Sequence, residues 1–157
     1  MAGMKPQLSL KGRALKYLAA REHSRLELTR KLAPHAESAE EVGRVLDELE
    51  QRGFLSAERF AESVVHRKAA RYGTARLKAE LAQHRLPEDL IRSVTEQLKA
   101  SEFDRAHALW ARRFGEPPTH PEDKARQTRF LAARGFAGDV IRRVLRGDGF
   151  RDPEQNT

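Results

Sequence analysis

Histidines and carboxylates are the side chains of this sequence that could carry acid–base or metal chemistry. The six histidines stand apart, none belongs to an HExxH pattern, and the chain has no cysteine to complete a set of metal ligands. His35 and His84 occupy matching places in a repeat described below, which favours a structural role, and His23 is expected to be an exposed turn residue. Glu40 and Glu41 begin a helix, where the helix dipole favours anions. We therefore predict no catalytic residue, no metal site and no cofactor, in a protein that is not an enzyme.

Basic side chains indicate binding instead. The 157 residues include 30 Lys and Arg against 23 Asp and Glu, which gives a formal net charge of +7 and a pI of about 10.1. This balance favours an acidic partner: nucleic acid, an anionic lipid or an acidic protein surface. Cations are concentrated in residues 64–85 and 124–151, whereas residues 36–62 are acidic.

The cationic stretch at 64–85 is the predicted partner-binding surface, because guanidinium groups pair with carboxylates and phosphates and a neighbouring Tyr can anchor a partner. The alternative is that these helices simply expose charged faces to water. The predicted partner-binding residues are Arg67, Lys68, Arg71, Tyr72, Arg76, Lys78 and Arg85.

The elements that must position these residues are all predicted to be helices, because no stretch shows the polar–apolar alternation of a strand. HSRLELTRKL at 23–32 contains a capping box, in which the Ser24 hydroxyl and the Glu27 carboxylate satisfy backbone N–H groups at the helix start. A second box is predicted at Ser38 and Glu41. Gly53 is expected to take the left-handed conformation after that helix, and Phe54 to fold back onto it. Further helix starts are predicted at Ser9, Ser56, Pro87 and Ser101, and a helix end near Tyr72 and Gly73. Residues 116–121 are expected to form a loop, followed by two helices with a break at Gly135 and Phe136.

The apolar pattern repeats at steps of 49 and 50 residues. The matching positions are Leu28, Leu77 and Gln127; Leu32, Leu81 and Leu131; and Val45, Val94 and Val144. A three-helix unit cannot bury its own apolar face, so neighbouring copies must cover one another. We predict an all-α protein of tandem three-helix repeats, with about nine helices, forming an elongated, curved solenoid-like chain.

The predicted organisation is a flexible N-terminal tail at 1–9, three-helix repeats at 10–55, 56–100 and 101–147, and a C-terminal tail at 148–157. No apolar segment follows MAGMKPQ, and no apolar run approaches the ~20 residues that cross a bilayer. We therefore expect neither a signal peptide nor a membrane partner, and the lack of cysteine fits an intracellular, reducing compartment.

Three stretches resemble the RecX family, the regulators of the bacterial recombinase RecA. They are REHSRLELTRKL at 21–32, GFLSAERFAES at 53–63 and RYGTARLKAEL at 71–81, within a likeness that covers roughly residues 10–147. Ser56 and Ala57 depart from the acidic residues that members often carry there, which affects only local capping. The resemblance implies an all-helical, cytoplasmic, non-enzymatic monomer that takes part in DNA repair, recombination and the SOS response.

The resemblance also implies the partner. RecX-like proteins bind RecA, particularly its filament on single-stranded DNA, and suppress filament extension, ATPase, strand-exchange and co-protease activity; some also contact DNA. The alternatives are a basic all-α protein that binds single- or double-stranded DNA directly, and an adaptor for another acidic protein. Against the first, basic and aromatic residues are not interleaved along the sequence as base stacking requires.

Overall fold

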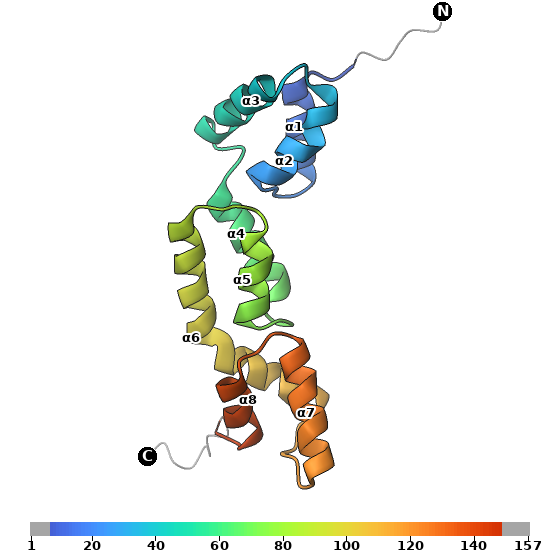
Figure 1. Cartoon of the computed structure of the whole chain (residues 1–157), viewed down its shortest axis with the longest axis vertical. Coiled ribbons are helices and arrows are strands. Elements are labelled where there is room, and N and C mark those ends of the chain that lie inside the picture. The colour runs from blue at the N-terminus through green and yellow to red at the C-terminus, as the bar shows by residue number, and fades with distance from the viewer. Residues whose placement is uncertain (1–6, 149–157) are drawn as a thin grey trace, which may run out of the picture. The chain divides into compact units, whose positions relative to one another are not determined.

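The computed structural model of the chain describes residues 7–148, and the regular structure within that range is helical (Figure 1). The elements are α1 (Leu10–Ala20), α2 (Arg25–Leu32), the 3-10 segment η1 (Ala33–His35), α3 (Ala39–Gln51), α4 (Ala57–Lys68), α5 (Thr74–Ala82), α6 (Glu88–Arg113), α7 (Pro121–Ala133) and α8 (Gly138–Leu145). The predicted all-α class is confirmed. None of the described helices is long and apolar enough to cross a membrane.

The chain divides into two compact units. The first unit holds the residues up to Ser63 together with His84–Leu86, and the second holds Val64–Gln83 together with the residues from Pro87 on. The predicted tails lie mostly outside the described residues. The predicted elongated outline stays a prediction.

Serine caps fix the helices of the first unit. The Gly12 N–H donates to the Ser9 hydroxyl over 3.0 Å, and Ser24 with Glu27 forms both halves of the predicted capping box. At Ser38 only half of the predicted box forms, because the Glu41 carboxylate accepts from the Glu37 N–H at 2.8 Å instead. Local sequence therefore sets each helix start in this unit.

The core of the first unit lies between α1, α2 and α3. Leu28, Leu32, Leu46 and Leu49 are fully buried there. Gly53 takes a positive φ of 79°, as predicted for the residue after α3. The prediction for the following residue was wrong: Phe54 is 48% exposed, and Leu55, at 4%, packs into the core.

Residues 7–148 form eight α-helices and one 3-10 segment, where about nine helices were predicted. The difference lies in the second unit. Ser101 does not begin a helix, because α6 runs without a break from Glu88 to Arg113, a stretch that contains neither Gly nor Pro. The predicted boundary at 100 and 101 therefore falls inside one helix, and the division into repeats stays a prediction.

The middle of α6 nevertheless has unusual hydrogen bonding. The Ser101 hydroxyl and the Arg105 guanidinium both donate to the Leu98 carbonyl, over 3.2 and 2.9 Å. Side chains that insert into the helical hydrogen-bond ladder accompany bends, and α6 changes direction near its midpoint (Figure 1). The Ser101 side chain thus marks a bend in the helix.

Eight of the nine predicted repeat positions are buried, and the ninth, Val45, is partly buried against the core of the first unit. Leu32, Leu81 and Leu131 all have 0% exposure. Gln127 takes the third-copy place of a leucine, is 4% exposed, and accepts a 2.8 Å hydrogen bond from the Trp110 indole N–H. A polar residue is tolerated in that core position because its amide oxygen has a buried donor.

Two glycines bring the start of α5 against the turn between α7 and α8. The Gly73 N–H donates to the Arg134 carbonyl over 2.8 Å. A Cβ at Gly73 would lie 2.3 Å from the carbonyl carbon and oxygen of Gly135. Since those atoms are backbone, they cannot move aside as a flexible side chain would.

Replacing Gly73 with Ala should therefore destabilise the second unit by about 1–3 kcal/mol or more, as overpacking does. The Gly73 φ of −78° suits any residue, so the cost is steric. Gly43→Ala in α3 is the matched control, because a Cβ there meets nothing within 4 Å and Ala favours a helix interior by about 0.5–1 kcal/mol. Urea denaturation followed by circular dichroism measures both; equal stability of the two variants would contradict the contact.

A polar cluster joins α2 to the His84 loop within the first unit. Glu27 accepts from the Ser24 N–H and pairs with the Arg21 guanidinium over 2.6 Å. The Ser24 hydroxyl lies 2.7 Å from the His84 Nδ1 atom. Burial would raise the pKa of the Glu27 carboxyl, but the hydrogen bonds from Arg21 and Ser24 outweigh it and lower the pKa to about 2.

His23 was expected to be exposed, and that prediction was wrong. Its ring is 2% exposed, its Nδ1–H donates to the Arg21 carbonyl over 3.0 Å, and its Nε2 lies 2.9 Å from the Lys31 ammonium. These contacts fit a neutral imidazole that donates at Nδ1 and accepts at Nε2. Burial accordingly lowers the pKa of His23.

Glu27 should make the first unit sensitive to acid. Its folded-state pKa lies below the unfolded value of about 4.3, so its stabilisation is present above that pH and is lost as pH falls towards 2. Glu27→Gln should flatten the dependence of the free energy of unfolding on pH between 2 and 4.3, whereas the exposed Glu37→Gln should not. Urea denaturation at several pH values measures this; identical slopes for both variants and the parent would refute the role of Glu27.

Candidate anion-binding site

The turn between α4 and α5 carries part of the predicted partner-binding surface, and a side chain of α6 holds it in place. The Arg105 guanidinium donates to the Ala69 carbonyl over 2.9 Å, to the Tyr72 carbonyl over 2.6 Å and to the Thr74 hydroxyl over 3.1 Å. Burial lowers the pKa of Arg105, against the opposing charge of Glu102. The Arg105 side chain thus holds the turn at three residues, Ala69, Tyr72 and Thr74.

Glu102 caps α5 from outside its own sequence. Gly73 stands at the N-cap and has no side chain to accept a hydrogen bond, so the Thr74 N–H donates to the Glu102 carboxylate over 2.8 Å. Glu102 is only 5% exposed, and the buried carboxylate satisfies an N–H that the helix start would otherwise leave without a partner. The direction in which α5 leaves the turn is therefore set by α6.

The fixed turn presents two arginines around one ring. The Arg76 guanidinium carbon lies 4.0 Å from the Tyr72 ring centroid, and that of Arg71 lies 5.6 Å from it. Both are cation–π distances. Neither arginine forms an ion pair with a carboxylate of residues 7–148.

A second group of arginines stacks where α6 ends against α7. Arg134 lies 3.7 Å from the Phe130 centroid and donates to the Phe130 carbonyl. Phe130 and Phe114 meet edge to face at 5.3 Å. Arg113 lies within cation–π distance of both rings, at 5.2 and 5.8 Å, and Arg126 lies 5.6 Å from Phe114.

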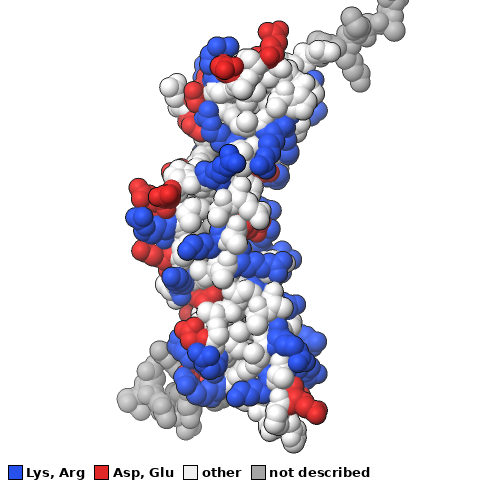
Figure 2. Space-filling view, viewed as in Figure 1, with Lys and Arg blue, Asp and Glu red and all other residues white. Residues whose placement is uncertain are grey.

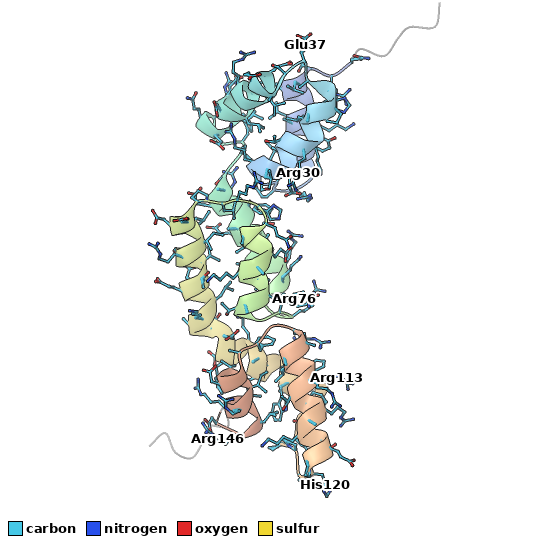
Figure 3. All side chains as sticks on the ribbon, viewed as in Figure 1. Arg30, Glu37, Arg76, Arg113, His120 and Arg146 are labelled. Atoms are coloured by element: carbon cyan, nitrogen blue, oxygen red, sulfur yellow. The ribbon has the colours of Figure 1, made fainter. Side chains whose placement is uncertain are left out.

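The two groups meet through the glycine contact, because Arg134 precedes Gly135 and a Cβ at Gly135 would lie 2.6 Å from the Arg76 Cβ. Arg76 and Arg113 lie along the same edge of the second unit (Figure 3). Lys and Arg side chains gather beside α5 and along α7 in the space-filling view (Figure 2). We name the whole set the arginine–aromatic cluster: Arg71, Tyr72, Arg76, Arg113, Phe114, Arg126, Phe130 and Arg134.

The arrangement is suited to binding anions. Guanidinium groups already occupy ring faces, so the rings are poorly placed to stack on bases, and they restrict the arginines to few rotamers. An arginine held in this way loses less side-chain entropy when its N–H fork meets a carboxylate or a phosphate. The cluster is therefore a candidate site for oxyanions.

The seven predicted residues have different outcomes. Arg71, Tyr72 and Arg76 come together in the cluster. Lys68 pairs instead with Glu80. The others are exposed outside the cluster: Arg67 on α4, Lys78 on α5, and Arg85 in the first unit, where its φ is 52°.

Sequence reasoning missed the contributions of α6 and α7, which are Arg113, Phe114, Arg126, Phe130 and Arg134. One signal was present: the 50-residue step that matches Leu81 to Leu131 also matches Arg76 to Arg126. The expectation that basic and aromatic residues are not interleaved is wrong for the cluster, where guanidinium groups lie within cation–π distance of the Tyr72, Phe114 and Phe130 rings. No group of three His, Asp or Glu side chains within residues 7–148 could hold a metal ion.

Comparisons with known proteins agree with the fold. Models of the first, second and third three-helix domains of RecX match residues 11–49, 58–94 and 100–145. The chain is 54% identical over 157 residues to a regulatory protein RecX of Leptothrix cholodnii, with both chains fully covered, and 57% identical over 147 residues to one of Ralstonia nicotianae, covering 94% of this chain and 92% of the relative. The crystal structure of RecX from Lactobacillus salivarius superposes with a TM-score of 0.73 at 17% identity, covering 87% of this chain and 92% of that one.

Removing the Arg105 side chain should loosen the turn that carries Tyr72. Arg105→Gln should cost about 1–3 kcal/mol of stability, because buried carbonyl groups lose their donor. Amide hydrogen exchange at residues 72–74 should accelerate, while Arg112→Gln, an exposed change on the same helix, should leave it unaltered. Unchanged protection at Gly73 and Thr74 in the Arg105 variant would contradict this role.

Proposed function

Because the chain belongs to the RecX family, we propose that it is a non-enzymatic cytoplasmic regulator that binds the RecA recombinase. Its target is the RecA filament on single-stranded DNA. Binding inhibits filament extension and thereby restrains ATPase, strand-exchange and co-protease activity. A bound protein that blocks the addition of further subunits is enough to inhibit the filament, so no catalytic group is required.

The observation that carries this proposal is the set of preorganised arginines without carboxylate partners. Within residues 7–148, Arg71, Arg76, Arg113 and Arg134 stack on aromatic rings and form no ion pair. A protein filament offers the same acidic groups at every subunit. Tandem helical repeats can contact several of them, and weak contacts then add through effective concentration.

Charge reversal in the cluster tests the proposal. Arg71→Glu combined with Arg76→Glu should raise the concentration needed to inhibit the ATPase of RecA filaments by about tenfold or more, which corresponds to about 1.4 kcal/mol or more. The double variant Arg92→Glu and Lys99→Glu is the matched control, since both residues are exposed on α6 outside the cluster. Circular dichroism checks that all variants fold. Full inhibition by the Arg71 and Arg76 variant would refute the proposed contact.

A second candidate function is direct binding to the phosphates of nucleic acid, because the guanidinium forks of the cluster fit a phosphate as well as a carboxylate. Phosphate binding would make log affinity fall with log salt at about −0.7 per contacted phosphate on single strands. Affinity for RecA alone, measured without DNA, separates the two functions. An adaptor for another acidic protein is the remaining alternative, and a pull-down with and without nuclease distinguishes it by the identity of the captured protein.

A further inference from the structure

A groove of about 560 Å³ lies between α7 and α8 within the second unit. Its floor is apolar: Phe136, Ile141 and Leu145 line it from the core side. Ala132 and Pro118 extend the apolar wall. The volume is within the range of about 300–1,000 Å³ typical of ligand pockets and has room for a large side chain.

The rim of the groove is cationic. Lys124, Arg142 and Arg146 line it, and no Asp or Glu does. Arg146 is paired with Asp148, but neither Lys124 nor Arg142 forms an ion pair with any carboxylate of residues 7–148. Among the described residues, the groove therefore combines an apolar floor with two positive charges that no carboxylate pairs.

The groove is separate from the arginine–aromatic cluster. Residues 124, 128 and 132 of α7 line the groove, whereas residues 126 and 130 belong to the cluster. A shift of two residues turns a helix by about 200°, so the two surfaces lie on nearly opposite faces of α7. Changes on one surface can thus be made without touching the other.

We propose that this groove binds an acidic segment of a partner protein, with one large apolar side chain seated on Phe136, Ile141 and Leu145 and flanking carboxylates facing Lys124 and Arg142. Charge complementarity selects an acidic partner, and the apolar floor favours a protein, because an aliphatic or aromatic side chain can stand directly beside carboxylates on neighbouring residues. This goes beyond the function proposed above: it assigns a second surface and the chemistry of its ligand, and it holds whether or not the cluster binds RecA.

The probe is a synthetic eight-residue peptide with a central Phe-Leu pair and three Asp or Glu residues on each side. Titrated into the ¹⁵N-labelled full chain, it should shift the amide resonances of residues 132–145 in a saturable way. The same peptide with Ser-Ser at its centre should lose the effect, since only the apolar contact is removed. Absence of saturable shifts at millimolar peptide overturns the proposal.

Two matched pairs of variants locate the binding. Ala132→Trp fills the groove from an exposed position, whereas Ala133→Trp adds the same ring at an exposed position outside it; Arg142→Glu reverses a rim charge, and Arg129→Glu reverses an exposed charge of α7 outside it. The two groove variants should weaken peptide binding by about tenfold or more, and their controls by less than about twofold. Equal weakening within either pair, in variants that keep the parent circular dichroism, overturns the proposal.

Three results would identify a different occupant and overturn the proposal. A dT oligonucleotide that displaces the peptide would indicate nucleic acid, and a dimer in sedimentation that Ala132→Trp abolishes would indicate a second copy of the chain. Contacts between the groove amides and another part of the same chain would indicate an internal segment. Failure of the Arg71 and Arg76 variant to relieve ATPase inhibition refutes only the earlier proposal, since the peptide titration contains no RecA.

Discussion

The close approach of two backbones, at Gly73 and Gly135, is the constraint on which the geometry of the second unit depends. It lets the Gly73 N–H reach the Arg134 carbonyl and brings the start of α5 against the turn before α8. The arginine–aromatic cluster is a consequence, because Arg76 follows one glycine closely and Arg134 directly precedes the other. Any side chain larger than hydrogen at position 73 would separate the two halves of the cluster.

The start of α5 differs from the matching helix start of α2 in the first unit. At the 49-residue step, Gly73 corresponds to Ser24 and Arg76 to Glu27, so the capping box of α2 has no counterpart at α5. The lost acceptor is supplied by Glu102, which the unbroken α6 brings to the Thr74 N–H. Because Glu102 caps α5, the position that matches Glu27 does not need a carboxylate, and it holds the exposed Arg76. The structural pair Ser24 and Glu27 of the first unit is thus matched in the second unit by residues of the proposed binding surface.

The sequence was most informative where structure is local. Ser9, Ser24 and Ser56 accept hydrogen bonds from backbone N–H groups at helix starts as predicted, because such a cap needs only residues three positions away. The apolar repeat located the buried leucines for a similar reason. Ser101 misled because the same hydroxyl can cap a helix or bond back to a carbonyl, and the choice depends on Arg105 and the turn that it holds. The cluster was only partly predictable. Its contacts between Tyr72 and Arg76 and between Phe130 and Arg134 join residues four positions apart, whereas the contacts of Phe114 with Arg126 and Phe130 depend on how α6 and α7 pack.

A regulator that works only by binding must select its partner through its contact surfaces. The two cationic surfaces of the second unit would contribute to that selection in different ways. Stacked arginines bind anions strongly but do not distinguish carboxylates from phosphates, because both fit the same guanidinium fork. Their long-range electrostatic attraction mainly raises the association rate, and salt weakens it. The α7–α8 groove adds a short-range condition, since its apolar floor rewards a side chain that a nucleic acid lacks. Because α7 carries the two surfaces on nearly opposite faces, a partner that satisfies both must present two acidic elements around one helix. That geometric requirement is far more selective than net charge alone.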